Sequence, residues 1–453
     1  MTWRYSACFS TIWCISLLAV PVAPILLIIG VTDSEETTAR VVLFVFATLL
    51  ALFALATRFW PRVKHQIRAG AFPFSMFDPA PKKTGEFIAA CIKANQNEGK
   101  LCVVSHAWSF YLAKRRAVGN RVWTLRFTGQ KNDGSWRSGT TIAQIKKTLE
   151  NKNKTFASSP TMEYASIGSW IATLSHGHPG TITALKETVE WAIVLNLLNY
   201  NTEQRTPQEL LAIFGSSTLR TSYVVISVKI ATVENEMVER FAFKVDSINA
   251  VDKWIRGEYV RIMFIGTAGP LGIVWNKKSV FNRNGTKHMH PHCCGAFCFW
   301  LTVDCLPSLP CASLGDLTRF DGFGTLSTAN SSINPPFYPI FSIWGQICCV
   351  YNLELLIPIQ PDATKLYSIV TEISNFHKNY TGRTELRMNN DTLFLDISMR
   401  SIAKLKLYFG MLFTKFKIDR AAQHPGKFTL DDLSPIKNIE ASVAMRPLSG
   451  SIA

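Results

Sequence analysis

The sequence LCVVSHAWS at residues 101–109 decides the fold, because an apolar run leads directly into a loop of small residues around a histidine. Its first four residues are typical of a short buried strand, and a helix is predicted before it over residues 85–97. Downstream, residues 122–127 are predicted to form another strand and residues 140–152 a helix. Strands and helices therefore both occur in this region, which predicts a globular domain built from the two kinds of element.

Further blocks follow at fixed places along the chain. Residues 136–141 read WRSGTT, residues 167–177 read IGSWIATLSHG, and residues 223–230 form a β run, YVVISVKI. With the loop at residues 105–109, this order resembles the FAD-binding domain of the vanillyl-alcohol-oxidase superfamily, which has the PCMH-type fold. Within it, the chain looks most like the sugar-1,4-lactone oxidases. The resemblance implies a FAD-binding domain of two α+β subdomains, followed by a mixed α+β substrate-cap domain.

The resemblance carries the cofactor-binding positions of the family onto this chain. Backbone N–H groups in a tight turn stabilise the charge of a pyrophosphate where no bulky side chain blocks the approach. Gly168 and Gly177 suit that role, since glycine admits close contact and positive φ. The positions expected to bind FAD are Val104, Ser105, His106, Ala107, Trp108, Ser109, Gly168, Ser169, Thr173, Ser175, His176, Gly177 and Val225.

His106 stands where the aldonolactone branch of the family often attaches the flavin covalently. A covalent link through His106 and a hydrogen-bonded structural histidine are both open from the sequence. The loop also departs from the family pattern, which usually reads Gly-x-Gly-His-Ser. Val104 and Ser105 stand where glycine is preferred, and Ala107 stands where serine is preferred, so the phosphate loop is less open than usual.

The second half of the chain carries three fragments similar to the lactone-oxidase branch, at residues 351–358, 384–397 and 423–428. Glu385 and Arg387 lie two apart on a predicted strand, so both side chains face the same way. Opposite charges on one face of a buried strand suit a polar pocket. An ion pair on an exposed strand is the alternative.

The family resemblance gives these residues catalytic roles. Arg387 would stabilise negative charge developing on the substrate or the reduced flavin, and Glu385 would orient Arg387 or the sugar hydroxyl. Lys427 lies in a fragment similar to the family's His-Trp-x-Lys motif, with Pro425 in place of Trp, and would add positive charge near the flavin. The His- and Cys-rich tract at residues 288–294 has no counterpart in the family. We expect a variable loop there and no metal site, because the tract lacks the second pair of ligands that structural zinc needs.

The N-terminus is predicted to form a membrane hairpin. Residues 12–31 are uncharged, apolar and long enough to span a bilayer, and residues 41–57 form a second run at the short end of spanning length. Basic residues follow the second run and the connecting loop is acidic, so the positive-inside rule places the large body in the cytosol. A cleaved signal peptide for the first run and a buried helix for the second are the alternatives.

The formal net charge of the chain is +16, and the positive residues are spread along it. Because no dense Lys/Arg run with interleaved aromatics, zinc finger or helix-turn-helix pattern occurs, we expect no nucleic-acid partner. The charge suits anionic lipid headgroups or an anionic cofactor. The 11 cysteines have no framework spacing, which favours reduced thiols and a cytosol-facing body.

These features predict three parts: a membrane anchor at residues 1–68, a FAD-binding domain at 69–232, and a substrate-cap and catalytic domain at 233–453. The expected reaction removes a hydride and a proton from a carbon–oxygen centre of an aldono-1,4-lactone and reduces FAD, which oxygen or another acceptor reoxidises. Two alternatives stay open. The altered loop favours a catalytically degenerate, membrane-tethered scaffold, and a flavin oxidase of an alditol or another alcohol would have a similar sequence.

Overall fold

The computed structural model of the chain describes part of the sequence. It covers residues 79–97, 101–106, 119–158, 165–175, 183–216, 219–256, 259–265, 270–277, 322–325, 351–359, 362–379, 383–389, 392–399, 401–416 and 422–423. The chain divides into two units, Met1–Ile67 and Arg68–Ala453, and every described residue belongs to the second. Both predicted membrane segments, 12–31 and 41–57, lie outside the described residues. Among the helices that are described, none has the length and apolar character needed to cross a membrane.

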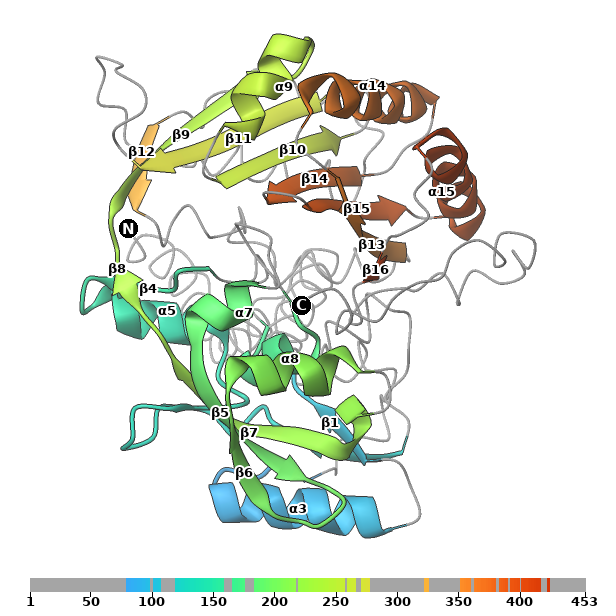
Figure 1. Cartoon of the computed structure of the whole chain (residues 1–453). Helices are drawn as coiled ribbons and strands as arrows, with labels where there is room; N and C mark the ends of the chain where they lie inside the picture. The colour runs from blue at the N-terminus through green and yellow to red at the C-terminus, as the bar shows by residue number, and fades with distance from the viewer. Residues whose placement is uncertain are drawn as a thin grey trace, which may run out of the picture. The chain divides into compact units, whose positions relative to one another are not determined.

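The first part of the described chain folds around a four-stranded antiparallel sheet of order β3-β7-β5-β6 (Figure 1). A parallel pair, β1-β2, and a short antiparallel pair, β4-β8, complete its strands. The elements are α3 (Thr84–Gln96), β1 (Leu101–Val104), β2 (Asn120–Trp123), β3 (Trp136–Arg137), α5 (Ile142–Glu150), β4 (Lys154–Thr155), α6 (Ile167–Ala172), α7 (Thr183–Thr188), β5 (Val189–Asn196), β6 (Thr202–Arg205), α8 (Pro207–Gly215), the 3-10 helix η2 (Leu219–Ser222), β7 (Tyr223–Ile230) and β8 (Val233–Glu234).

Local chemistry explains where these elements begin. The helix predicted at 140–152 is α5, which starts after a capping box: the Thr141 side chain accepts from the Gln144 amide, and the Gln144 side chain accepts from the Thr141 amide.

β7 is buried on both faces. Val225 packs in a core with α5, α6 and α8, while Val224 packs in a second core with α3. β7 therefore lies at the centre of this part of the fold.

One strand is shorter than the sequence predicts. β2 ends at Trp123, and the chain turns at Thr124, whose carbonyl accepts from the Phe127 amide at 2.9 Å. The apolar residues after Trp123 serve packing instead: Phe127 is fully buried and stacks on Phe87 of α3, with the ring centroids 4.5 Å apart. The prediction of a strand over residues 122–127 is wrong beyond Trp123, because burial of an apolar run does not require an extended backbone.

The second part of the described chain is an eight-stranded antiparallel sheet of order β12-β9-β11-β10-β14-β15-β13-β16 (Figure 1). Helices α9, α14 and α15 pack on one face of it through a single hydrophobic core. The elements are β9 (Met237–Lys244), α9 (Ile248–Ile255), β10 (Tyr259–Ile265), β11 (Pro270–Lys277), β12 (Gly322–Thr325), β13 (Tyr351–Pro358), α14 (Ala363–Asn379), β14 (Arg383–Asn389), β15 (Thr392–Met399), α15 (Ile402–Phe416) and β16 (Ala422–Gln423).

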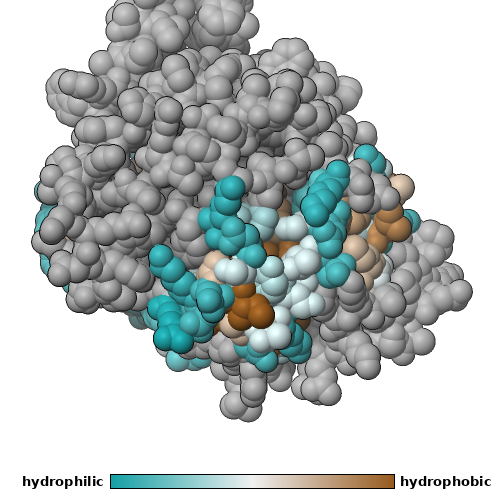
Figure 2. All heavy atoms as spheres, turned by 90° about the horizontal axis from the view of Figure 1, so that it is seen from above, coloured by the Kyte–Doolittle hydropathy of each residue, from teal (hydrophilic) through white to brown (hydrophobic). Residues whose placement is uncertain are grey.

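One face of the molecule shows both hydrophilic and apolar side chains among its described residues (Figure 2). Seen from above, hydrophilic side chains surround small apolar patches (Figure 2). Exposed large apolar residues include Ile248 on α9 and Leu407 on α15, both isolated examples of a kind common on folded proteins. Both cysteines among the described residues, Cys91 and Cys102, are free thiols.

Candidate active site

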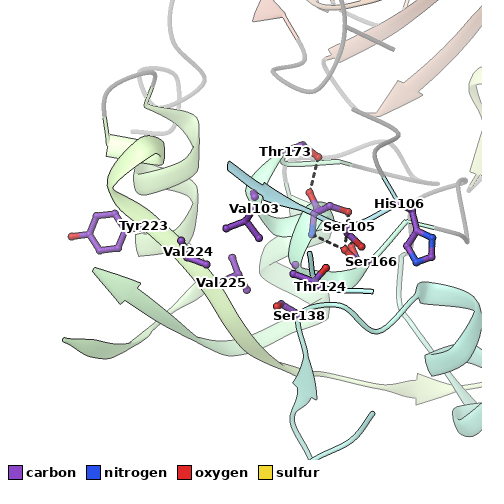
Figure 3. A pocket seen from close by; sticks show the side chains of 13 residues that line it. Val103, Ser105, His106, Thr124, Ser138, Ser166, Thr173, Tyr223, Val224 and Val225 are labelled. Atoms are coloured by element: carbon purple, nitrogen blue, oxygen red, sulfur yellow. Dashed lines mark hydrogen bonds between the residues drawn. The ribbon is translucent and has the colours of Figure 1, made fainter. Parts of the chain in front are cut away.

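A cavity of about 210 Å³ opens where β1, α6 and the start of β7 meet (Figure 3). It is lined by residues from these elements and from the chain after β2 and β3. The lining residues are Val103, Ser105, His106, Thr124, Ser138, Ser166, Gly168, Ser169, Ala172, Thr173, Tyr223, Val224 and Val225. All four sequence blocks of the predicted cofactor domain therefore contribute residues to the same cavity.

The cavity brings together many of the residues predicted to bind FAD. Those that line it are Ser105, His106, Gly168, Ser169, Thr173 and Val225. Ser175 does not line it, but its hydroxyl lies 2.8 Å from that of Thr173. Five further predicted cofactor residues, and Lys427, lie outside the described residues: Ala107, Trp108, Ser109, His176 and Gly177.

Val104 is predicted to bind the cofactor, but its side chain points away from the cavity. Side chains alternate along a strand, so Val103 faces the cavity and Val104 faces a small core that it shares with Trp123. The Val104 side chain is fully buried and fills no space in the cavity, and 104 is the variable position of the pattern Gly-x-Gly-His-Ser when it is aligned on His106. Val104 therefore does not obstruct the site.

Several lining residues were not predicted: Val103, Thr124, Ser138, Ser166, Ala172, Tyr223 and Val224. Thr124 follows β2, which pairs in parallel with β1, so both strands deliver the residues after them to the same edge. Ser138 lies in the WRSGTT block, and Ser166 directly precedes the IGSWIATLSHG block. Both blocks were recognised, but nothing in the sequence distinguished these serines from their neighbours.

Two glycines allow the lining segments to approach one another. A Cβ on Gly168 would lie 2.6 Å from Ser138 Cβ and 2.9 Å from the Ser138 carbonyl oxygen, and one on Gly139 would lie 2.0 Å from the Thr124 carbonyl oxygen. All three distances are below 3.0 Å, which real Cβ atoms essentially never show. The segment around Ser138 can therefore contact α6 on one side and the residues after β2 on the other only because both positions are glycine.

Three of the hydroxyl groups that face the cavity are buried without a hydrogen-bond partner among the described residues. They belong to Ser105, Thr124 and Ser138, whose exposed fractions are 9%, 2% and 3%. A buried hydroxyl without a partner costs on the order of 1–3 kcal/mol, so such groups in a native fold usually meet a ligand or water. Figure 3 shows these hydroxyls on one side of the cavity and the valines of β1 and β7 on the other.

The backbone amides at the start of α6 are already used inside the protein. The Ile167 amide donates to the Thr140 carbonyl at 2.8 Å, and the Gly168 amide donates to the Ser138 carbonyl at 2.8 Å. The Ser169 amide donates to the side chain of Ser166, which caps the helix. The expectation that the Gly168 amide holds a pyrophosphate does not agree with this geometry. Side-chain hydroxyls of the cavity are donors that this part of the structure does offer.

The composition and volume of the cavity limit what it can hold. Six of its 13 lining residues are serine or threonine, and none of the 13 is Lys, Arg, Asp or Glu. Its volume of about 210 Å³ is below the roughly 300–1,000 Å³ of a site for a whole cofactor. These features fit one part of FAD, with hydroxyls facing phosphate oxygens and valines facing an apolar group. His106 lies at the rim, half-buried.

A second cluster of functional side chains lies on the eight-stranded sheet. Arg387 Nη2 on β14 is 2.8 Å from Glu354 Oε1 on β13 and 3.6 Å from Asp396 Oδ2 on β15. Its Nε is 3.4 Å from Glu385 Oε1 on the same strand. The side chains of Arg387, Glu354 and Glu385 are at most 4% exposed, so the alternative of an exposed surface ion pair is wrong.

Strand alternation places this cluster on the face of the sheet opposite the helices. Leu386 and Met388 pack in the core with α14 and α15, so Glu385 and Arg387, which alternate with them along β14, face the other way. The two charged side chains thus share one face of the strand, as predicted. The cluster brings three carboxylates to one guanidinium. Burial of these charged groups is expensive unless each is paired, and the guanidinium supplies such a partner to the carboxylates of all three strands.

The sequence matches no protein-family model and no curated protein. Solved structures are nevertheless similar in fold. Cholesterol oxidase from B. sterolicum has a TM-score of 0.57 at 12% identity, over 82% of this chain and 86% of its own. A solvent-stable cholesterol oxidase has a TM-score of 0.53 at 12% identity, over 77% and 83% of the two chains. The chain has the fold of these oxidases.

The same fold occurs in a protein described by a different activity. Phl p 4, a grass pollen allergen with glucose dehydrogenase activity, has a TM-score of 0.55 at 9% identity, over 82% of this chain and 84% of its own. At such low identity the likeness establishes the mixed α+β fold and leaves the substrate to be argued from the site.

Proposed function

We propose that the chain is a FAD-dependent oxidoreductase that acts on a CH–OH group. The observation that carries the proposal is the cavity itself. Blocks of sequence that resemble a FAD-binding domain converge on it, and three buried hydroxyls without partners face into it. The fold shared with cholesterol oxidase supports the same assignment.

FAD would supply the redox chemistry by accepting a hydride from the substrate. The protein's part at the cavity is to hold the cofactor. We assign to Ser105, Thr124 and Ser138 the donation of hydrogen bonds to phosphate oxygens, since each hydroxyl can donate one proton and none has another partner among the described residues. Hydrogen bonds to an ionised acceptor are about twice as strong as neutral ones, so three of them give substantial affinity.

The charged cluster on β13, β14 and β15 is proposed to act on the substrate. Arg387 offers a fixed cation that can stabilise negative charge on the substrate oxygen during oxidation. Glu354 and Asp396 hold the guanidinium in one orientation, and Glu385 is the carboxylate proposed to accept or orient the hydroxyl proton. Lys427 is proposed to join this site on the strength of the sequence resemblance.

The substrate we propose is an aldono-1,4-lactone, with oxygen or another acceptor reoxidising the cofactor. The support is the family order of the fragments that contain Glu354, Glu385 and Lys427. A covalent link through His106 belongs to the same proposal, and the half-buried position of this residue at the cavity rim leaves it accessible to a flavin. The N-terminal hairpin is proposed to anchor the protein in a membrane, with the body in the cytosol.

The test is the visible absorption spectrum of the full-length protein, purified in detergent and then precipitated with acid. Flavin that stays with the pellet supports attachment through His106, and His106→Ala should release it to the supernatant. Flavin found only in the supernatant keeps the oxidoreductase and removes the covalent link. Protein that binds no flavin, even after FAD is added, contradicts the proposal and leaves the membrane-tethered scaffold.

A substrate panel separates the remaining alternatives. Anaerobic mixing of the flavin-loaded protein with aldono-1,4-lactones, alditols and simple alcohols should bleach the flavin absorption with the lactones first. Bleaching by an alditol alone would replace the lactone in the proposal without changing the cofactor. Repeating the reaction with oxygen or an artificial electron acceptor then identifies which acceptor restores the spectrum.

A further inference from the structure

A buried polar network lies on the helix side of the sheet, behind the strand that carries Glu385 and Arg387. His377 Nε2 on α14 is 2.9 Å from Thr384 Oγ1 on β14, and Thr384 Oγ1 donates to Tyr408 Oη on α15 at 3.1 Å. Thr384 and Tyr408 are fully buried, and His377 is 3% exposed. One hydroxyl therefore joins two helices to one strand, inside a core that is otherwise apolar.

The directions of these hydrogen bonds define the state of the histidine. Since Thr384 donates its single hydroxyl proton to Tyr408, it must accept from His377, so His377 Nε2 carries the proton. His377 Nδ1 is buried with no partner among the described residues. An unprotonated nitrogen tolerates that position better than an N–H would, so the ring is the neutral Nε2–H form.

The surroundings of the ring keep it neutral and fixed. Phe264 of β10 stacks on it with the centroids 5.9 Å apart, and Phe376 and Tyr408 meet it edge-on at 6.0 Å and 5.9 Å. Phe376 in turn stacks on Tyr408 at 4.1 Å. Burial lowers the pKa of His377 to about 4. The network is therefore rigid, and it holds no net charge near neutral pH.

Thr384 and Glu385 are adjacent on β14 and point to opposite faces of the sheet. Thr384 is held by the helices, while Glu385 and Arg387 belong to the charged cluster. We propose that His377, Thr384 and Tyr408 are positioning residues that fix the start of β14 and thereby the orientation of Glu385 and Arg387. The catalytic consequence rests on the proposed oxidoreductase function, but the positioning of the strand does not.

The test uses substitutions that remove single hydroxyls from the full-length protein. Thr384→Val has almost the same shape without the hydroxyl, and Thr384→Ser keeps the hydroxyl. Thr371→Val is the matched control, because Thr371 lies on α14 and its hydroxyl donates to the Tyr367 carbonyl of the same helix, one turn earlier. The measurements are hydrogen exchange of peptides covering β14, with α5 as an internal reference, and kcat, KM and FAD affinity where the wild type is active.

We expect Thr384→Val to increase hydrogen exchange in β14 at least tenfold while α5 is unchanged, because the strand loses its hydrogen bonds to His377 of α14 and Tyr408 of α15. It should lower kcat about tenfold and leave FAD affinity within about twofold, since small misplacement of a catalytic group is costly. In Thr384→Ser, hydrogen exchange in β14 and kcat should both lie within about twofold of wild type. Thr371→Val should match wild type in both measurements.

Unchanged exchange in β14 of Thr384→Val, or an equal change in Thr371→Val, would overturn the proposal. Failure of the proposed function gives a different result: the wild type then binds no flavin, and the exchange data alone decide whether the network fixes β14. Faster exchange in β14 with an unchanged kcat would overturn the catalytic part of the proposal.

Discussion

Arg387 Nη2 on β14 lies 2.8 Å from Glu354 Oε1 on β13, although β15 lies between these two strands in the sheet. The guanidinium thus spans three strands, and contacts a carboxylate on each of them. A planar group with donors on both edges can make such contacts, whereas an ammonium group cannot. The cluster therefore depends on arginine at this position and not on a positive charge alone.

We expect Arg387→Lys to lower kcat by about 10²-fold, the usual effect of removing one preorganised donor from a reacting oxygen. It should also lower the free energy of unfolding by about 3 kcal/mol, because an ammonium group cannot contact the carboxylates of all three strands at once. Steady-state kinetics and urea unfolding measure the two effects. Arg256→Lys is the control, because Arg256 is 76% exposed at the side chain and should change neither value. Wild-type kcat in Arg387→Lys would contradict the role of the guanidinium.

The hydroxyls that face the cavity can be tested by cofactor affinity. Ser138→Ala and Thr124→Val should each weaken FAD binding by about 1–2 kcal/mol, or roughly tenfold, because each removes one donor to a charged oxygen. Calorimetric titration of FAD into the protein freed of flavin measures this change. Ser227→Ala is the matched control: its hydroxyl is also buried without a partner among the described residues, but it does not line the cavity. An equal loss in Ser227→Ala would remove the specific role of the other two.

Ser105 allows a direct comparison between the family pattern and this structure. The family prefers glycine at this position, so the sequence pattern alone predicts that Ser105→Gly improves FAD binding. The structure predicts the opposite, because the buried Ser105 hydroxyl faces the cavity without another partner among the described residues. We expect about a fivefold loss of affinity, from one hydrogen bond to an ionised group. Tighter binding by Ser105→Gly would show that the hydroxyl obstructs the loop.

Gly168 should not tolerate a side chain. Gly168→Ala places a Cβ 2.6 Å from Ser138 Cβ, so α6 or the Ser138 segment must move and the cavity must change shape. We expect a loss of about 1–3 kcal/mol in the free energy of unfolding, the usual cost of overpacking, with weaker FAD binding. Gly410→Ala is the matched control, because it is also helical and has nothing within 4 Å of the new Cβ. Gly410→Ala should be neutral or slightly stabilising.

His377 predicts a defined dependence of stability on pH. Its pKa is lowered from 6.5 to about 4 in the folded protein by burial among apolar and aromatic groups, so the unfolded chain binds the proton more readily as the pH falls. The free energy of unfolding should therefore decrease between about pH 6.5 and pH 4, by about 3 kcal/mol from this group. Urea unfolding at several pH values should show a smaller decrease in His377→Gln, which cannot titrate. An identical pH dependence in the two proteins would contradict a neutral buried His377.

Much of the fold and part of the site could be predicted from the sequence. The α5 pattern of apolar residues and the alternation that places Glu385 and Arg387 on one face of a strand are local properties. The blocks around Ser105 and Gly168 were likewise recognised within short stretches. These features can be predicted without the rest of the chain, because residues close in the sequence determine them.

The site residues that the sequence did not predict depend on contacts between segments that lie far apart in the chain. Thr124 and Ser138 reach the cavity only through the pairing of β1 with β2 and the close packing allowed by Gly139 and Gly168. The fragment at residues 351–358 was recognised, but Glu354 within it was not identified as a partner of Arg387, because neither segment determines the order of strands in the sheet. The amide of Gly168 was assigned to a phosphate, although the carbonyl of Ser138 already accepts from it.

The absence of Lys and Arg from the 13 residues around the cavity has a consequence for how the cofactor would be retained. Dissolved salt weakens binding chiefly by screening attraction between full charges, over a Debye length of about 10 Å at 0.1 M. Hydroxyl donors enclosed in a cavity act at contact distance, where mobile ions cannot enter between the partners. FAD held in this way would stay bound in concentrated salt, and the net charge of +16 would assist its arrival without determining how long it stays.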